Sequence, residues 1–502
     1  EAESLRFIEP LAIPDFLLFG EPIEAVQVLN NAQISGWAAR QSLAPVAAPP
    51  PSDPQPSLFE QPMNSETKPA PIPSAAKSNT RHGALGRFPQ YRYSGLPWLG
   101  EIPEHWDVRR NGRLFAERVE TGFEDLPILE VSLRTGVRVR DMENGARKQQ
   151  MADRSKYKRA AKGDIAYNMM RMWQGAVGVA PVDGLISPAY VVARPFLEVD
   201  PRYYTYLFRT TAYMREVNKF SRGIVSDRNR LYWDEFKQMP SAFPPTEEQT
   251  RIADFLDDHG RRTTRLIRNK RRLIGLLNEQ KQAIINRAVT RGLNPDAPMK
   301  PTGIDWMPEV PAHWEVIPLR HLSTCLDGRR VPLEASAREK MLGDIPYWGA
   351  NQIIDHLNDF LFDEDLILLG EDGAPFFDRN KPVAFFSQGK VWPNNHIHVL
   401  RPKPGNRPEF IVHALNCVDY TSYVGGATRD KLTQSYMKAI PIPVPPKDEQ
   451  DAILDRLTQE CTPLDKTAER AAREIGFIQE YRERLIADVV TGKLDVRHIE
   501  IA

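Results

Sequence analysis

The sequence has few cysteines and no long apolar run, and each absence excludes a class of protein. Three cysteines occur in 502 residues, Cys325, Cys417 and Cys461, and they lie far apart. This spacing excludes a disulfide framework and a structural zinc knuckle, and it is typical of a reducing compartment. No stretch reaches the ~20 apolar residues of a membrane-spanning helix, and no basic segment followed by an apolar one opens the sequence. We therefore expect a soluble cytoplasmic protein.

The sequence also lacks a net charge, but its charges are unevenly distributed. Residues 81–293 contain 38 Lys and Arg against 25 Asp and Glu, whereas residues 294–502 contain 24 against 32. The basic first half favours a polyanionic partner, and the acidic second half would need local basic clusters to contact one. At this length we expect two to four domains.

An internal repeat is the strongest positive feature. SGLPWLGEIPEHWDV at 94–108 recurs 208 positions later as TGIDWMPEVPAHWEV, and PPTEEQ at 244–249 recurs 201 positions later as PPKDEQ. Each Pro-Pro motif precedes a segment in which seam residues recur every three or four positions, as in a coiled coil. The repeat predicts two similar units, each with an opening motif, a variable body and a long helix.

The two predicted helices cover residues 244–293 and 444–497. Prolines just before each helix, and Gly292 and Gly492 near its end, fit the usual start and stop signals. Neither seam is purely apolar, so pairing the helices with each other buries them better than two independent surface helices would. The predicted seams are Ile252, Leu256, His259, Thr263, Leu266, Lys270, Leu273, Leu277, Gln280 and Ile284, and Ile453, Leu457, Leu464, Thr467, Ala471, Ile478, Tyr481 and Leu485.

The bodies at 109–240 and 317–441 contain short apolar runs broken by Gly, Pro, Asn and Asp, which predicts strands and turns. Strands are predicted at 127–133, 177–179, 366–369, 383–386 and 396–400, and helices at 203–220 and 408–420. The predicted fold is α/β (α+β): two globular domains, at 85–243 and 294–443, separated by two long antiparallel helices that form a coiled coil, with a pseudo-twofold internal repeat. Residues 1–43 are an unassigned N-terminal extension, 44–84 a Pro/Ala/Ser-rich linker, and 498–502 a tail.

Several motifs carry a family likeness. FPQYRYSGLPWLGEIPEHW at 88–106 resembles the opening of many specificity subunits of type I restriction-modification enzymes. GDIPYWGAN at 343–351, NNH at 394–396 and GGATRDKLTQ at 425–434 resemble a common form of that family's target-recognition domain. The likeness covers residues 85–497 and is weaker in the first body, where SDRNR at 226–230 replaces the TRDK pattern.

This resemblance implies a role in phage defence. It implies two target-recognition domains that read the two halves of a split double-stranded DNA target. It also implies assembly with two modification subunits, which methylate adenine with S-adenosylmethionine, and with restriction subunits, which translocate and cleave DNA with ATP and Mg²⁺. On this reading the chain itself holds no cofactor, no metal and no catalytic residue.

Patterns for catalysis or metal binding are incomplete in the sequence. SPAY at 187–190 lacks the second proline and the glycine loop of an adenine methyltransferase. Asp227 with Glu235 and Lys237 has the letters of a nuclease site, but the second copy has Tyr436 instead of the glutamate. His396 and His398 alternate on a predicted strand with no third ligand nearby. The alternatives to a binding subunit are the specificity part of a fused methyltransferase, with its catalytic domain upstream of residue 1, and a scaffold for protein assembly.

Candidate DNA contacts follow from the chemistry of base edges. Arg reads guanine, Asn and Gln read adenine, and Lys and Arg also bind phosphates. The candidates are Asn168, Arg171, Trp173, Gln174, Arg222, Arg228 and Arg230 in the first body, and Asn351, Gln352, Arg379, Lys381, Asn394, Asn395, Arg429 and Lys431 in the second. Trp98, Trp106, Trp306 and Trp314 are expected to be structural anchors between each body and the helices.

Overall fold

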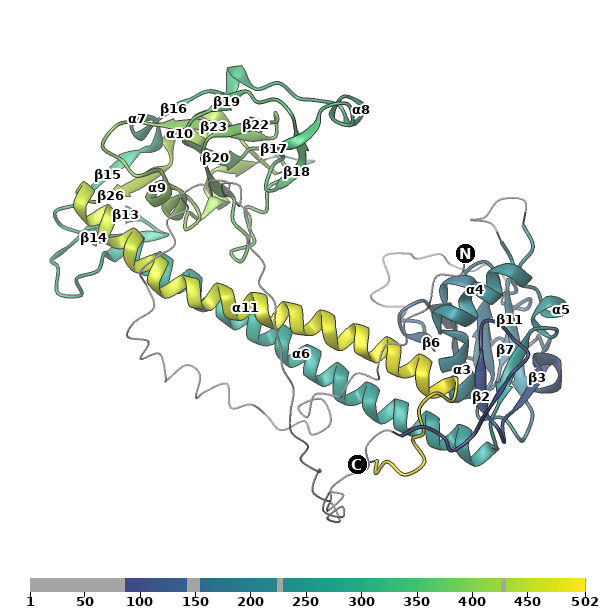
Figure 1. Ribbon diagram of the computed structural model, residues 1–502. Helices are drawn as coiled ribbons and strands as arrows, with labels where there is room; N and C mark the ends of the chain where they lie inside the picture. The colour runs from purple at the N-terminus through teal and green to yellow at the C-terminus, as the bar shows by residue number, and fades with distance from the viewer. Residues whose placement is uncertain (1–85, 142–153, 224–228, 426–429, 502) are drawn as a thin grey trace, which may run out of the picture. The chain divides into compact units, whose positions relative to one another are not determined.

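The computed structural model describes residues 86–141, 154–223, 229–425 and 430–501. It divides into two compact units: the chain up to Ile267 together with the chain from Gly476 onward, and Arg268–Ile475. Each unit holds one globular domain and the adjoining parts of two long helices, α6 (Thr246–Arg291) and α11 (Lys447–Val490) (Figure 1). No helix among these residues is long and apolar enough to cross a membrane.

The long helices start and stop at the predicted signals, although α11 ends at Val490, earlier than the predicted range of 444–497, and Val444 belongs to β26 (Pro441–Val444). Each begins directly after a Pro-Pro pair, where the missing N–H has no helical partner to lose, and each has two acidic residues in its first turn. Gly292 follows α6 with φ of 70°, and Gly492 follows α11 with φ of 76°. The left-handed backbone at these two positions favours glycine and ends both helices.

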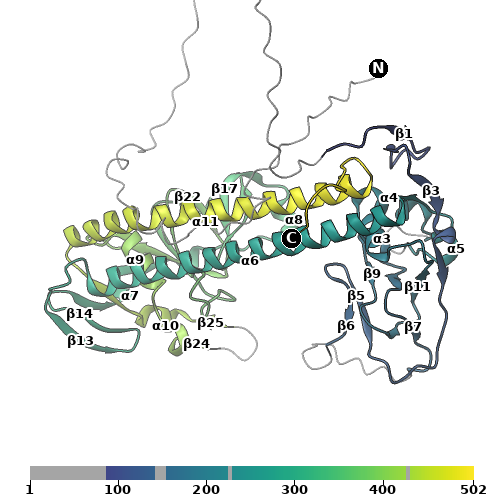
Figure 2. The ribbon, with the colours of Figure 1, turned by 90° about the horizontal axis from the view of Figure 1, so that it is seen from below.

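The two helices run antiparallel and lie side by side in both views (Figures 1 and 2). In the first unit the ring centroids of His259 on α6 and Tyr481 on α11 are 5.8 Å apart. In the second unit Lys270 Nζ donates to Glu474 (2.5 Å) and Lys281 Nζ donates to Asp465 (2.7 Å). The predicted pairing of the long helices is therefore confirmed within each unit.

Two predicted seam positions are wrong. Gln280 and Thr467 are exposed, while Lys281, next to Gln280, pairs with Asp465 of α11. The predicted seam also omits Cys461, which is buried in a cluster with Ile285 of α6. The prediction followed a strict 3.5-residue repeat, whereas an α-helix has 3.6 residues per turn, so the contacting face drifts away from the heptad positions along helices of this length.

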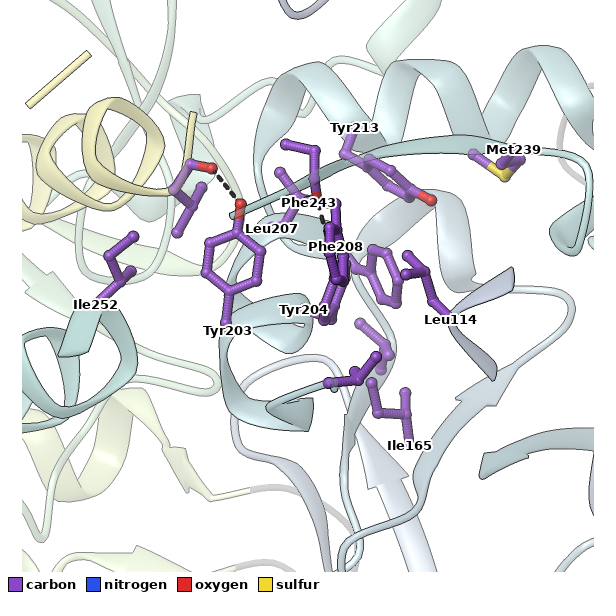
Figure 3. Close-up of a cluster of buried hydrophobic side chains, with 14 of the residues drawn as sticks. Leu114, Ile165, Tyr203, Tyr204, Leu207, Phe208, Tyr213, Met239, Phe243 and Ile252 are labelled. Atoms are coloured by element: carbon purple, nitrogen blue, oxygen red, sulfur yellow. Dashed lines mark hydrogen bonds between the residues drawn. The ribbon is translucent and has the colours of Figure 1, made fainter. Parts of the chain in front are cut away.

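Domain 1, the described part of residues 86–243, is built on a four-stranded antiparallel sheet with the order β4-β11-β8-β9. Two helices, α3 and α4, pack aromatic side chains against this sheet, and Ile252 of α6 joins the same core (Figure 3). The hydroxyl of Tyr203 donates to Val490 O at the end of α11 (2.8 Å). One continuous core therefore includes the domain and both helix ends.

The elements of domain 1 are β1 (Tyr91–Tyr93), β2 (Glu101–Pro103), β3 (Asp107–Arg110), η1 (Asn111–Arg113), β4 (Phe115–Glu117), β5 (Leu129–Ser132), β6 (Gly136–Val139), β7 (Lys158–Ala160), β8 (Ile165–Asn168), η2 (Met172–Gln174), β9 (Val177–Val179), β10 (Gly184–Ile186), β11 (Tyr190–Pro195), α3 (Pro201–Phe208), α4 (Thr211–Phe220), α5 (Trp233–Phe236) and β12 (Pro240–Phe243).

Domain 2, residues 294–445, repeats this sheet with the order β16-β23-β20-β21 and adds a second sheet with the order β18-β17-β22-β19. The repeated sheet shows that the two weakly similar bodies share a frame. The added sheet carries several of the Asn and Gln residues that the sequence singled out.

The elements of domain 2 are β13 (Met299–Ile304), β14 (Met307–Pro311), β15 (Glu315–Pro318), α7 (Leu319–Leu322), β16 (Ser323–Cys325), η4 (Asp327–Arg329), α8 (Ala335–Arg338), β17 (Leu342–Trp348), β18 (Ile353–Leu357), β19 (Phe362–Asp363), β20 (Leu366–Gly370), β21 (Ala384–Ser387), β22 (Lys390–Pro393), β23 (Ile397–Pro402), α9 (Pro408–Leu415), η5 (Tyr420–Ser422), β24 (Val424–Gly425), β25 (Lys431–Leu432), α10 (Gln434–Ala439) and β26 (Pro441–Val444).

Both predicted body helices are shorter than expected. The predicted helix at 203–220 is two helices, because Thr210 has extended backbone and its hydroxyl caps α4 by accepting from Tyr213 N. The predicted helix at 408–420 ends at Leu415, where the Asn416 side chain turns to bind the backbone of Val383 and Ala384. Side-chain hydrogen bonds of this kind compete with helix continuation.

Candidate nucleic-acid interface

Each domain is fixed to the start of a long helix by the repeated motifs. In domain 1, Glu248 of α6 accepts hydrogen bonds from Trp106 Nε1 (2.8 Å) and His105 Nε2 (2.7 Å). In domain 2, Glu449 of α11 accepts from Trp314 Nε1 (3.0 Å) and His313 Nε2 (2.8 Å). The repeated glutamate of the Pro-Pro motif is therefore the partner of the repeated His-Trp pair.

The repeated glutamine beside it binds a different segment. Gln249 Nε2 donates to Pro244 O (2.8 Å), and its Oε1 accepts from the backbone of Asp200, just before α3. Gln450 makes the same bonds to Pro445 O (2.9 Å) and from the backbone of Arg407, just before α9. In each domain, the repeated Glu and Gln therefore hold the opening motif and one helix of the body against the start of a long helix.

The same tryptophans also contact the end of the other long helix. A Cβ added at Gly492, after α11, would lie 3.0 Å from the Trp106 ring, and one at Gly292, after α6, would lie 3.1 Å from the Trp314 ring. Trp106 and Trp314 are fully buried, so their predicted anchoring role is confirmed. Trp98 and Trp306 are half-buried and pack against the cores that contain Trp106 and Trp314.

Domain 1 brings most of its candidate DNA contacts together. Asn168 ends β8 and residues 169–174 follow it. Leu231 N donates to Met169 O (3.0 Å), which joins this segment to the bridge between Arg222 and Arg230. Arg171, Gln174, Arg222 and Arg230 are exposed. Arg222 also pairs with Glu235 (2.5 Å), and Arg228 lies outside the described residues.

Two of the domain 1 candidates shape the loop instead of projecting from it. Asn168 is buried, and its Oδ1 accepts from Met170 N (2.9 Å). Trp173 is half-buried and donates from Nε1 to Met170 O (3.1 Å). Their base contacts stay predictions that the hydrogen bonds do not favour.

Domain 2 gathers five candidates around the end of β22. Asn351 and Gln352 form the β17–β18 turn, Asn394 and Asn395 form the β22–β23 turn, and Lys431 is on β25, close to α10 (Figure 2). Asn394 N donates to Trp348 O (3.0 Å), which joins the first two turns. Glu371 N donates to His396 O (3.0 Å), and Asp372 forms a β-bridge with Lys431. These two contacts connect β25 to the β22–β23 turn.

The other domain 2 candidates lie elsewhere or outside the described residues. Arg379 pairs with Asp419 near η5 (3.7 Å), and Lys381 pairs with Asp378 in the loop after Phe376 (3.0 Å). Within the described ranges, no hydrogen bond joins either residue to the candidates around β22. Arg429 lies outside the described residues. Gln352, Asn395 and Lys431 are exposed, whereas Asn394 is buried with its Oδ1 accepting from His396 N (2.5 Å).

A buried charged network lies beneath this cluster, and sequence reasoning missed it. His398 is fully buried, with Nδ1 2.6 Å from Asp327 Oδ2 and Nε2 2.9 Å from Leu432 O. Arg330 Nη1 donates to Glu371 Oε2 (2.5 Å) and to Ile397 O (2.9 Å). Glu371 also pairs with Lys431 (3.2 Å). The network therefore contacts two of the segments that carry candidate DNA contacts.

The expectation that His398 has no third ligand nearby is wrong, because ligand atoms of Asp327, Glu371 and His398 lie within 4.8 Å of one another. A metal ion does not suit the group, however. Both nitrogens of His398 are engaged, and Arg330 already neutralises Glu371. A cation would have to displace these bonds and tolerate the guanidinium. The group is therefore better described as a satisfied hydrogen-bond network.

The network sets the ionisation of Asp327. Burial alone would raise the pKa of this carboxyl group. Hydrogen bonds from His398 and Val399 N, with the positive charges of His398 and Arg330, outweigh burial and lower the pKa to about 2. Asp327 is therefore an ionised acceptor at neutral pH.

Known proteins share both the sequence pattern and the fold. The family model for the type I restriction modification DNA specificity domain matches residues 107–275 and 311–470. A putative type I restriction enzyme specificity subunit of Haemophilus influenzae is 34% identical over 144 residues, 28% of this chain and 36% of that protein. A putative type I restriction enzyme specificity subunit of Methanocaldococcus jannaschii is 24% identical over 443 residues, 80% of this chain and 96% of that protein.

A solved chain from a structural study of complex assembly and conformational transition of the type I R-M system superimposes with a TM-score of 0.58. The superposition covers 78% of this chain and 98% of that chain at 14% identity, so it shows the shared fold alone. The family model therefore matches twice, once in each half of the internal repeat. The chain therefore belongs to the type I restriction-modification DNA specificity family.

Proposed function

We propose that the chain is the non-catalytic specificity subunit of a type I restriction-modification complex and reads a split double-stranded DNA target, one half with each domain. The observation that supports this most directly is the repeated frame with divergent surfaces. Both domains have the same four-strand order and the same Trp-Glu anchor, yet the segments that carry exposed Asn, Gln, Arg and Lys differ. A shared scaffold with different polar loops suits recognition of two different base sequences.

On this proposal the chemistry belongs to partner subunits. Two modification subunits with S-adenosylmethionine would methylate adenine, and restriction subunits with ATP and Mg²⁺ would move and cleave DNA. The purified chain would recognise DNA and supply none of these reactions. The domain 1 surface would use Arg171, Gln174 and Arg230, and the domain 2 surface Gln352, Asn395 and Lys431.

A domain exchange tests the proposal. Residues 109–240 would be replaced by the corresponding body of a family member with a different target, and the methylated adenines in cells with the modification subunits would be mapped by sequencing. We expect one half of the methylated target to change and the other to stay the same. If both halves change together, the two domains form one composite reading site and the proposal is wrong.

A further inference from the structure

The two domains support equivalent segments with different chemistry. Leu231 N donates to Met169 O in domain 1 (3.0 Å), and Leu432 N donates to Glu371 O in domain 2 (2.8 Å). This shared bond makes Met169 the counterpart of Glu371. The register of the β4–β11 pair against the β16–β23 pair likewise makes Val191 the counterpart of His398 and Val119 that of Asp327.

Domain 1 therefore buries the apolar Val191 at the place of His398. Met169, at the place of Glu371, is half-buried, whereas Val119, at the place of Asp327, is exposed. A buried charged network needs every bond made, and replacing such networks by apolar residues is often neutral for stability. Filling the core does not require His398, since a valine occupies its place in domain 1. Positioning of the surrounding segments explains the network better than core filling does. Hydrogen bonds are directional and define a geometry, whereas apolar contacts do not.

The bonds of His398 identify what is fixed. The ring nitrogens face Asp327 Oδ2 and Leu432 O, and a carbonyl oxygen can only accept, so Nε2–H donates to Leu432 O. Leu432 adjoins the exposed Lys431, whose ammonium group also pairs with Glu371. On the opposite side of the network Arg330 donates to Asn395 O (3.4 Å). The network thus joins β25 to the β22–β23 turn.

We propose, on the basis of the function proposed above, that His398 is a positioning residue for the second half-target. Its Nε2–H holds Leu432, and with it Lys431, beside the turn that carries Asn395. Domain 1 has a valine, Val191, at the position of His398, so this support belongs to domain 2. His398 therefore affects recognition of one half-target only.

Two substitutions of His398 separate positioning from charge and burial. The amide nitrogen of Gln lies close to the place of the imidazole Nε2, and that of Asn close to Nδ1, so His398→Gln keeps a donor toward Leu432 O and His398→Asn keeps one toward Asp327. Both replace the titratable imidazole with a neutral amide. Binding of the complex with the modification subunits would be measured on duplexes with the mapped target intact, with the first half scrambled, or with the second half scrambled.

We expect His398→Asn to lower discrimination at the second half-target by about tenfold, the order expected for one lost hydrogen bond. His398→Gln should stay within about threefold of the original chain, and discrimination at the first half-target should not change in either variant. Leu368→Ala is the control: this fully buried residue of β20 belongs to a core cluster separate from the one that contains Leu432, and its truncation weakens the domain without touching a network bond.

Equal effects of the Asn and Gln variants, or an equal loss in the Leu368→Ala control, would overturn the proposal. Should His398→Asn not fold, Lys431→Met decides, because this side chain is exposed and His398 is proposed to act through it. Unchanged reading of the second half-target by Lys431→Met also overturns the proposal. A complex of the original chain that distinguishes neither half-target contradicts the proposed function instead.

Discussion

At the residue scale, the chemistry of the candidate interface depends on side chains that do not face solvent. Lys431 and Asn395 are exposed, but each is connected to buried charges through Glu371 or Arg330. The anchors follow the same principle, since a buried indole N–H needs an acceptor and Glu248 or Glu449 supplies it. A surface that reads bases needs such support, because long polar side chains otherwise adopt many rotamers.

The low pKa of Asp327 predicts a dependence of stability on pH. Its folded pKa is about 2, below the usual 3.8, so ionised Asp327 stabilises the folded state above about pH 4 and this contribution is lost as the pH falls toward 2. The lowering corresponds to roughly 2 kcal/mol at neutral pH. Thermal unfolding of the original chain and of Asp327→Asn should therefore differ most near neutral pH and converge on acidification. A difference that grows below pH 4 would contradict the assigned ionisation.

The sequence predicted types of residue at the interface better than their roles. The Asn, Gln, Arg and Lys candidates were chosen because their chemistry suits base edges, and several do lie together on exposed turns. Asn168 and Asn394 instead accept from the backbone N–H of the residue two positions later. Sequence cannot distinguish this role from base contact, because the same amide serves both. The partners Asp327, Arg330 and Glu371 are distant from His398 in sequence, so only the sheet register brings them together.

At the element scale, the long helices were the most predictable part of the chain. Their periodicity, prolines and glycines are local signals, and α6 and α11 begin and end where these signals indicate. The body helices were less predictable because side-chain bonds from Thr210 and Asn416 interrupt them. The second sheet of domain 2 was not predicted, since its strands pair across long loops and β17 is parallel to β22.

Pro463 within α11 leads to a prediction about this helix. A proline inside a helix lacks the N–H that the carbonyl of residue 459 would accept, and it costs about 3 kcal/mol in an average helix. Pro463 is exposed, so Pro463→Ala removes little packing and should raise the midpoint of thermal unfolding. Lys466→Ala, an exposed change on the same helix, is the control and should have a much smaller effect. A lower midpoint for Pro463→Ala would mean that α11 requires a local distortion there.

At the scale of the whole molecule, the pseudo-twofold repeat is a property of the anchors and not of the bodies. Trp106 binds the start of α6 beside the end of α11, and Trp314 binds the start of α11 beside the end of α6. Each domain can therefore change its surface loops without changing its attachment to the helices. This separation explains why the repeat is clear at the anchors and weak between them.

The length of α6 and α11 bears on the spacing of the two proposed half-targets. If α6 and α11 set the distance between the half-targets, four residues inserted after Leu273 lengthen α6 by ~6 Å and rotate it by ~40° beyond a full turn. An insertion of four residues is a stutter, which unwinds a coiled coil locally without destroying it. Neither reading surface is altered, so the methylated half-targets should keep their bases while their separation changes by one or two base pairs of ~3.4 Å.

Mapping of methylated adenines in cells with the modification subunits measures both quantities at once. Four residues inserted after Gly405, in an exposed turn of domain 2, add the same length outside the helices and should leave the target unchanged. A changed separation in both variants would show that added length anywhere disturbs the complex. If the insertion in α6 changes the half-target bases while the separation stays fixed, the helices do not set the spacing and the division of roles between helices and domains is wrong.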